Sequence, residues 1–151
     1  MSGLAARAVL YALAFGAGVA LTVQVGVNAA ARGYLRGNAA SAALLSFVTG
    51  GVALALYVAV SGGTWLPRSA LAAPAWVWAG GVLGAAYVLA SMMLGPRLGA
   101  LAFFSLVILG QLASSVLVDH FGLLGFPRAP LSAGRLLGLL ALMLGAWLIN
   151  R

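Results

Sequence analysis

The chain has one acidic residue, one histidine, no cysteine and no lysine among its 151 residues. Without cysteine it can form neither a disulfide framework nor a thiolate metal site. Asp119 and His120 alone are too few to bind a metal, so we expect neither a metal nor a cofactor. Ser114 and Ser115 have no histidine at a helical spacing that would face them, so an enzyme with a serine nucleophile is not expected.

Charge of either sign is scarce. Charged residues make up 6% of the chain and hydrophobic residues 64%, whereas soluble domains contain about 25% charged residues. The net charge of +7 comes from arginines scattered singly along the sequence, and a nucleic-acid site needs basic residues gathered on one face. Composition therefore predicts a membrane protein whose arginines contact lipid headgroups, with no nucleic acid as a partner.

Long apolar runs divide the sequence into five segments of membrane-spanning length. We predict an all-α membrane protein with a single domain, residues 1–151, and five transmembrane helices at residues 4–27, 39–60, 75–94, 99–119 and 131–149. The third is expected to end before Pro96, which lacks a backbone N–H, and Ser132 is a candidate cap for the fifth. The first segment also resembles a signal peptide, but its apolar run exceeds the roughly 7–15 residues of such peptides, so we expect a span.

The arginines divide evenly between the two sides of the membrane. With five spans, the chain ends and connections alternate sides, which gives two groups: Arg7, Arg68, Arg128 and Arg135 on one side, and Arg32, Arg36, Arg97 and Arg151 on the other. An excess of Lys or Arg on one side normally fixes orientation, and this division provides none. We therefore expect dual topology, with each copy pairing with an inverted copy of itself in an antiparallel homodimer.

Polar residues within the spans fall on single helix faces. Small and hydrogen-bonding residues repeat at helical spacing on the first four segments. Two interpretations remain open for these stripes: helix packing through small and polar contacts, or the lining of a shared cavity. Under the second, the substrate-binding candidates are Gln24, Asn28, Ser46, Tyr87, Ser91, Gln111 and Ser115. The fifth segment has small residues without polar ones, which favours packing or dimerisation.

Asp119 and His120 lie where the fourth span ends. Histidine titrates near neutrality, so the pair is a candidate for proton coupling. The alternative is a salt bridge from Asp119 to Arg128 or Arg135 that braces the following loop, because an acid at a helix C-terminus favours a cationic partner. Adjacent helical residues point about 100° apart, which disfavours one site lined by both.

Four motifs carry a family resemblance: residues 24–28 (Gln-Val-Gly-Val-Asn), 96–99 (Pro-Arg-Leu-Gly), 110–112 (Gly-Gln-Leu) and 119–131, which runs from Asp119 through Gly125-Phe126-Pro127 to Leu131. Over nearly its whole length the chain resembles the YdcZ-type family, a five-span branch of the drug/metabolite transporter superfamily. The resemblance implies a transporter of the bacterial inner membrane, in a family that includes dual-topology homodimers, paired heterodimers and fused ten-span proteins. Small multidrug-resistance relatives use a glutamate in their first helix, which this chain lacks.

These observations together favour a secondary transporter of a small metabolite or amphipathic compound. An inverted pair supports alternating access, with the binding site near the membrane midplane between subunits. The expected partners are the inverted copy, the small-molecule substrate and membrane lipids. The alternatives are a passive channel and a non-transporting membrane assembly or scaffold protein.

Overall fold

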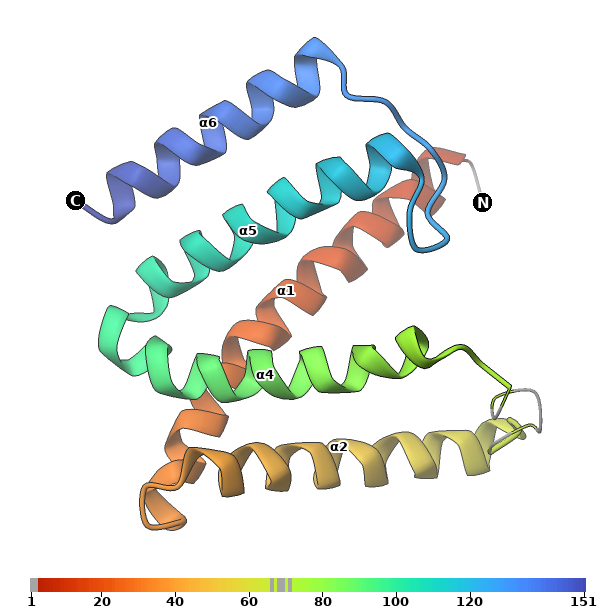
Figure 1. Ribbon diagram of the computed structural model, residues 1–151, viewed down its shortest axis with the longest axis vertical. Helices are drawn as coiled ribbons and strands as arrows, with labels where there is room; N and C mark the ends of the chain where they lie inside the picture. The colour runs from red at the N-terminus through yellow and green to blue at the C-terminus, as the bar shows by residue number, and fades with distance from the viewer. Residues whose placement is uncertain (1–2, 66, 68–69, 71) are drawn as a thin grey trace. The chain divides into compact units, whose positions relative to one another are not determined.

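The regular elements of the chain are helices throughout the part that the structure, a computed structural model, describes: residues 3–65, 67, 70 and 72–151 (Figure 1). In sequence order they are α1 (Gly3–Tyr34), α2 (Ala39–Ser61), α4 (Ala75–Leu98), α5 (Ala100–Phe121) and α6 (Ala133–Ile149). The first four are long and apolar enough to cross a membrane. Helix α6 is also apolar, but its 17 residues span only about 26 Å, near the lower limit for a crossing. The described residues thus form the predicted helices, which are consistent with a membrane protein, while the crossing by α6 stays a prediction.

The chain divides into two compact units, Met1–Arg97 and Leu98–Arg151. The first contains α1, α2 and α4, and the second contains α5 and α6. Each unit is described by itself below. The predicted single domain and the antiparallel dimer stay predictions.

Helix α1 is longer than the sequence pattern predicted. The predicted first span ended at residue 27, with Arg32 in a polar turn, but the helix continues to Tyr34. Ala29, Ala30 and Ala31 favour helix strongly, and Arg32 in the last turn complements the negative end of the helix dipole. The turn is consequently short, and Asn38 caps α2 by accepting a hydrogen bond from the backbone N–H of Ser41 at 3.0 Å.

Pro96 lies inside α4, not beyond it. The predicted span ended at residue 94, whereas the helix continues to Leu98. A proline N–H would have bonded to the carbonyl of Met92, four residues earlier, and its absence leaves that acceptor free. The Arg32 guanidinium donates to this carbonyl oxygen at 3.0 Å. Because a side chain replaces the missing donor, the helix continues through the proline.

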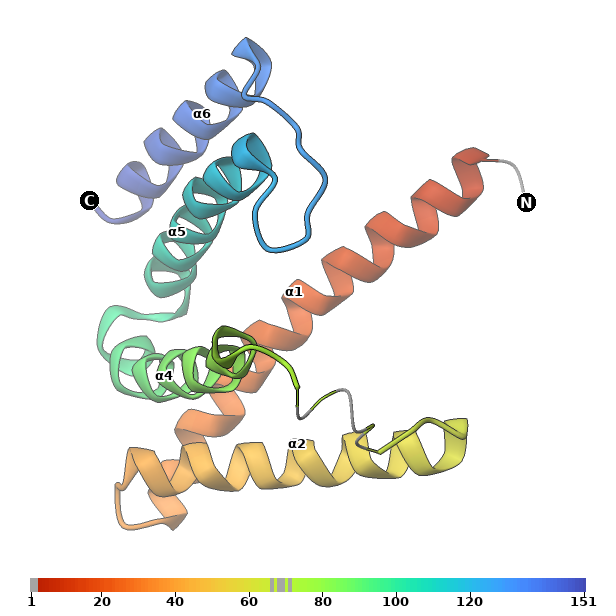
Figure 2. The same ribbon diagram turned by 45° about the vertical axis from the view of Figure 1, so that its right-hand side comes forward.

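The buried core of the first unit is small. It consists of Val25 from α1, Ala42 and Ala43 from α2, and Val88 and Met92 from α4. Most large apolar side chains are exposed instead, and only 6–17% of the most apolar window of each spanning helix is buried. Figure 2 shows the first half of α1 extending beyond α2 and α4. These exposed apolar faces fit a lipid environment or contact with another membrane helix.

The second unit is an antiparallel helical hairpin. At one end, the Asn150 amide donates to the Ser105 hydroxyl at 2.9 Å. At the other, Arg135 and Asp119 form an ion pair at 3.5 Å. Ser132 caps α6 as predicted, because its hydroxyl accepts the backbone N–H of Arg135 at 3.3 Å.

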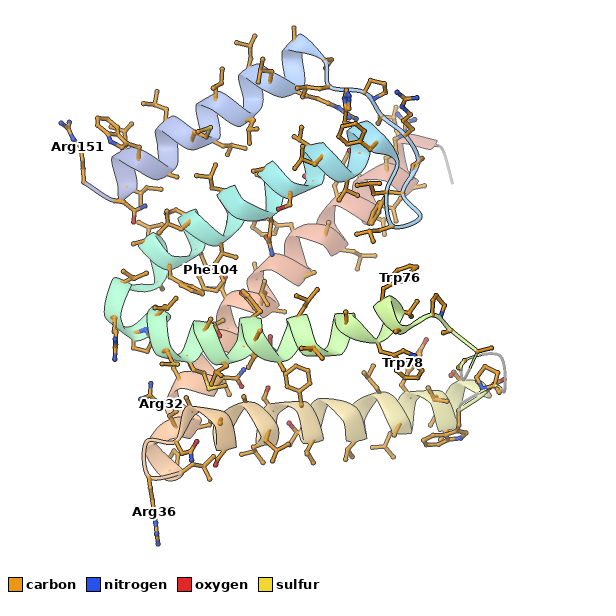
Figure 3. All side chains as sticks on the ribbon, viewed as in Figure 1. Arg32, Arg36, Trp76, Trp78, Phe104 and Arg151 are labelled. Atoms are coloured by element: carbon orange, nitrogen blue, oxygen red, sulfur yellow. The ribbon has the colours of Figure 1, made fainter. Side chains whose placement is uncertain are left out.

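The two ends of the first unit carry different side chains (Figure 3). Arg32 and Arg36 lie at the turn between α1 and α2, while Trp76 and Trp78 lie at the beginning of α4, at the opposite end. Arginine and tryptophan are both side chains that suit the membrane interface. The bond from Arg32 to Met92 also brings the C-terminal ends of α1 and α4 together, as alternating spans require. Arg68 lies outside the described residues.

Candidate functional site

An open groove lies at mid-length of α2 and α4 in the first unit. Its volume is about 280 Å³. Gln24 from α1 and Ser46 from α2 bring polar groups to it, and both are predicted site residues. The complete lining is Gln24, Ser46, Phe47, Gly50, Gly51, Leu54 and Val88. A pocket with an apolar body and a few polar groups is the usual form of a small-molecule site.

Phe47 was not among the predicted site residues. Its ring approaches Gly84 on α4 so closely that a Cβ there would lie 3.5 Å from the ring carbon Cζ. The glycine pair Gly50–Gly51 leaves open space on α2, because a Cβ added to either glycine would have no other group within 4 Å. Two adjacent glycines within an apolar helix were the available sequence clue, but periodicity alone does not say which apolar ring faces them.

Asn28 lies one turn beyond Gln24 on the same ridge of α1 and is almost completely enclosed. Its side chain is 6% exposed, and its Nδ2 has no hydrogen-bond partner. The Tyr87 hydroxyl on α4 is likewise enclosed and without a partner. An unmatched buried polar group costs about 1–3 kcal/mol. Among the described residues of the first unit, these two enclosed polar groups thus have hydrogen-bonding capacity that the chain itself leaves unused.

Ser91 also lies in this region, but its hydroxyl already has a hydrogen-bond partner. It is fully buried, and its hydroxyl donates to the Val88 carbonyl one turn earlier in α4 at 2.7 Å. The small side chain lets the helices approach, and its donor has no need of a ligand. Contact between α1 and α4 is close here, since a Cβ on Gly95 would lie 3.4 Å from Val25.

Arg32 extends the ridge of Gln24 and Asn28 by one further turn. Its side chain is half-buried and is held by two backbone carbonyls, those of Met92 at 3.0 Å and Gly37 at 3.1 Å. Both partners are neutral, so they orient the guanidinium without compensating its charge. The ridge therefore leads from the groove to an enclosed amide and then to an anchored cation.

Gln111 and Ser115 lie in the second unit, on α5. They share an open hollow of about 460 Å³, lined by Gly110, Gln111, Ser114, Ser115, Val118, Asp119 and Phe126. A second groove of about 310 Å³ lies between α5 and α6, and its lining includes Ser115, Asp119 and Arg135. The hydroxyl of Ser115 donates to the Leu112 carbonyl at 2.9 Å. The predicted site residues thus fall into two groups, one in each unit.

Asp119 is tied to the residues around it. Besides its ion pair with Arg135, its backbone carbonyl accepts the N–H of Ala129 at 2.7 Å. Arg135 also donates to the Ala129 carbonyl at 2.9 Å. The carboxylate therefore braces the return of the loop to α6, and its partner is Arg135, one of the two arginines considered from the sequence.

His120 and Arg128 hold the same loop. Nδ1 of His120 accepts the backbone N–H of Leu131 at 3.3 Å, and the Arg128 Nε donates to the His120 carbonyl at 3.2 Å. Gly122 has φ +64°, and a Cβ there would lie 3.2 Å from the Arg128 Cβ. Glycine suits this position because it adopts a positive φ without strain and has no Cβ to contact Arg128. These bonds give the loop residues a structural role.

Comparison with known families places the chain. A family model described as "Putative inner membrane exporter, YdcZ" matches residues 9–148. Comparisons with curated proteins and with solved structures found no match. The match covers nearly the entire chain, as the sequence motifs indicated, and its description is that of a membrane transporter and not of an enzyme. Together with the apolar helices, it shows that this chain belongs to the YdcZ family of the inner membrane.

Proposed function

We propose that the chain is a dual-topology secondary transporter of a small metabolite or amphipathic compound in the bacterial inner membrane. Two copies in opposite orientation would form the working unit. The four-to-four division of arginines supports this arrangement, because neither orientation is favoured by the positive-inside rule. Inverted copies are related by an axis in the membrane plane, which is the symmetry on which alternating access relies.

The groove lined by Gln24 and Ser46, one turn of α1 away from the enclosed Asn28 amide, supports this proposal. Gly50 and Gly51 lie at the middle of α2, and Val88 lies near the middle of α4, so the groove is near mid-membrane depth if these helices cross upright. Polar groups at that depth are costly unless they face protein or water. A substrate with hydrogen-bonding groups would satisfy them when bound, and the apolar walls of Phe47 and Leu54 would contact its body.

Cysteine accessibility tests this site cleanly because the native chain has no cysteine. Gln24→Cys and Ser46→Cys should react with a small aqueous thiol reagent in membranes. Leu83→Cys is the control, since this residue is 69% exposed on the apolar surface of α4, where lipid excludes the reagent. Equal inertness at all three positions would refute a water-accessible groove.

Flux in liposomes separates the proposed carrier from the alternatives. Saturable uptake of a compound that binds the purified protein is the expected result. Flux that rises linearly with concentration would indicate a channel instead. Absence of flux for every compound that binds would leave the assembly or scaffold function.

A further inference from the structure

We propose that the site takes a substrate bearing a hydrogen-bond acceptor group, specifically a carboxylate, and excludes organic cations. This inference rests on the proposed transport site and specifies its substrate class. It follows from three features of the first unit: the absence of acids, the enclosed donors and the anchored guanidinium of Arg32.

The first feature is the absence of any acid in residues 1–97. The only acid of the chain, Asp119, lies in the second unit and pairs with Arg135. A cation removed from water needs an opposite charge or several acceptors to replace its hydration. The groove residues offer no carboxylate for this purpose, so a bound organic cation would remain uncompensated.

The second feature is the pair of unmatched polar groups. The Asn28 amide brings two N–H donors, and its Nδ2 is enclosed without an acceptor. The Tyr87 hydroxyl is one further donor that is enclosed without an acceptor. A carboxylate has two oxygens that together accept several hydrogen bonds and no donor of its own. It is the group that best matches donors of this kind.

The third feature is the charge of Arg32. Two of its five N–H groups bond to the carbonyls of Met92 and Gly37, which leaves three donors. Along the ridge, Arg32 lies one turn beyond Asn28 and two turns beyond Gln24, about 12 Å from Gln24 at about 1.5 Å per residue. Hydrogen bonds between a guanidinium and a carboxylate are stronger than neutral ones. Asn28 and Arg32 lie outside the lining of the groove but on the same ridge of α1 as Gln24, so a substrate with its body in the groove would direct its carboxylate along this ridge toward both.

Thermal unfolding of the purified full-length protein with matched probe pairs tests the substrate class. The probes are butyrate with butylamine and benzoate with benzylamine, at equal concentration and ionic strength. At least one carboxylate should raise the melting temperature in a concentration-dependent way, as a ligand of the native state does, and its amine partner should not. Equal or larger shifts with the amines, or no shift with either carboxylate, would overturn the inference.

Asn28→Asp provides the matched variant, because it keeps the side-chain shape and replaces the amide with an anion. It should abolish the carboxylate shift. Should this variant fail to fold, labelling of Gln24→Cys gives an independent readout. A carboxylate at twice its Kd should slow labelling about threefold, since the free fraction is the inverse of one plus the ratio of concentration to Kd.

The outcomes separate this inference from the proposed function. If amines alone protect Gln24→Cys, the site exists and the substrate class is wrong. If Gln24→Cys and Ser46→Cys do not react at all, the transport site itself is absent. If the position reacts and neither carboxylate protects it, the carboxylate assignment fails while the groove remains.

Discussion

The first unit contains enclosed polar groups without a partner, whereas in the second unit the Asp119 carboxylate and the Asn150 amide both have partners. Among the residues that the structure describes, the enclosed side-chain atoms without a partner are Nδ2 of Asn28 and the hydroxyl of Tyr87, both in the first unit. In the second unit, Asp119 pairs with Arg135, and the Asn150 amide reaches Ser105. Polar residues that looked alike in the sequence therefore occur in two different settings.

This difference separates polar groups that stabilise the fold from polar groups that are available to a ligand. A polar group satisfied by the chain stabilises the fold and gains little from a ligand. An enclosed group without a partner lowers the free energy of unfolding, and a ligand that forms a hydrogen bond with it recovers this free energy. We therefore expect substitutions in the first unit to affect binding more than stability, and substitutions in the second unit to do the reverse.

The largest expected effect is on binding in the first unit. Asn28→Leu retains the branched shape and removes the amide, so the carboxylate probe should bind and move at least about tenfold more weakly, the equivalent of one lost hydrogen bond of about 1.4 kcal/mol. Proteoliposome uptake and the ligand-induced melting shift measure this. Ser91→Ala is the control, because its hydroxyl is already bonded within α4. A comparable loss in both variants would mean that packing between α1 and α4, not the amide, is what matters.

Next in size is a stability effect in the loop of the second unit. Gly122→Ala should lower the free energy of unfolding by about 1–2 kcal/mol, because L residues are strained at φ +64° and the new methyl group contacts Arg128. Gly110→Ala is the matched control, since no group lies within 4 Å of a Cβ there. Thermal unfolding of both variants measures the difference. Equal stability would show that the loop does not hold this conformation.

Orientation should respond to single charges placed at opposite ends of the spans. Tyr34→Lys adds a charge at a side chain that is 92% exposed, beside Arg36, and Leu123→Lys adds one on the side of Arg128. Each should change the ratio of orientations roughly fivefold, in opposite directions, for about 1 kcal/mol per charge. A C-terminal reporter read on both sides of the membrane records it. If wild-type protein already has one orientation, dual topology is wrong.

The smallest expected effect concerns the ion pair. Both side chains of the Asp119–Arg135 pair are partly exposed, so Asp119→Asn should cost no more than about 1 kcal/mol. Uptake of the carboxylate probe and its dependence on pH should be unchanged. Loss of that pH dependence in folded protein would instead assign Asp119 to proton coupling.

Hydrophobic periodicity and length were enough to locate the five helices that the structure describes, because lipid-facing segments need about 20 apolar residues regardless of their tertiary contacts. The cap at Ser132 followed from residue type alone. The end of α4 did not follow, because it depends on a long-range bond. Arg32 supplies the donor that Pro96 lacks, across 60 positions in the sequence, and local rules contain no such information.

The candidate site could be predicted from the sequence only in part, because helical spacing shows which residues share a face but not which hydrogen bonds they form. Spacing along α1 and α2 indicated Gln24 and Ser46, which share a groove. Spacing did not distinguish Asn28 from Ser91, since both are buried polar residues and only their hydrogen bonds differ. The contribution of Phe47 depends on which turn of α4 lies opposite it, a packing detail that helical periodicity leaves open.

Unfolding of Asn28→Leu and Asp119→Asn, measured side by side in one detergent without ligand, tests the contrast between the units most directly. We expect only Asp119→Asn to lose stability. Asn28→Leu should melt at or above wild type, because it removes an enclosed group that lacks a partner. Asp119→Asn should melt slightly below wild type, because it breaks an existing pair. If Asn28→Leu melted well below wild type and Asp119→Asn did not, the amide would be structural and the contrast would be contradicted.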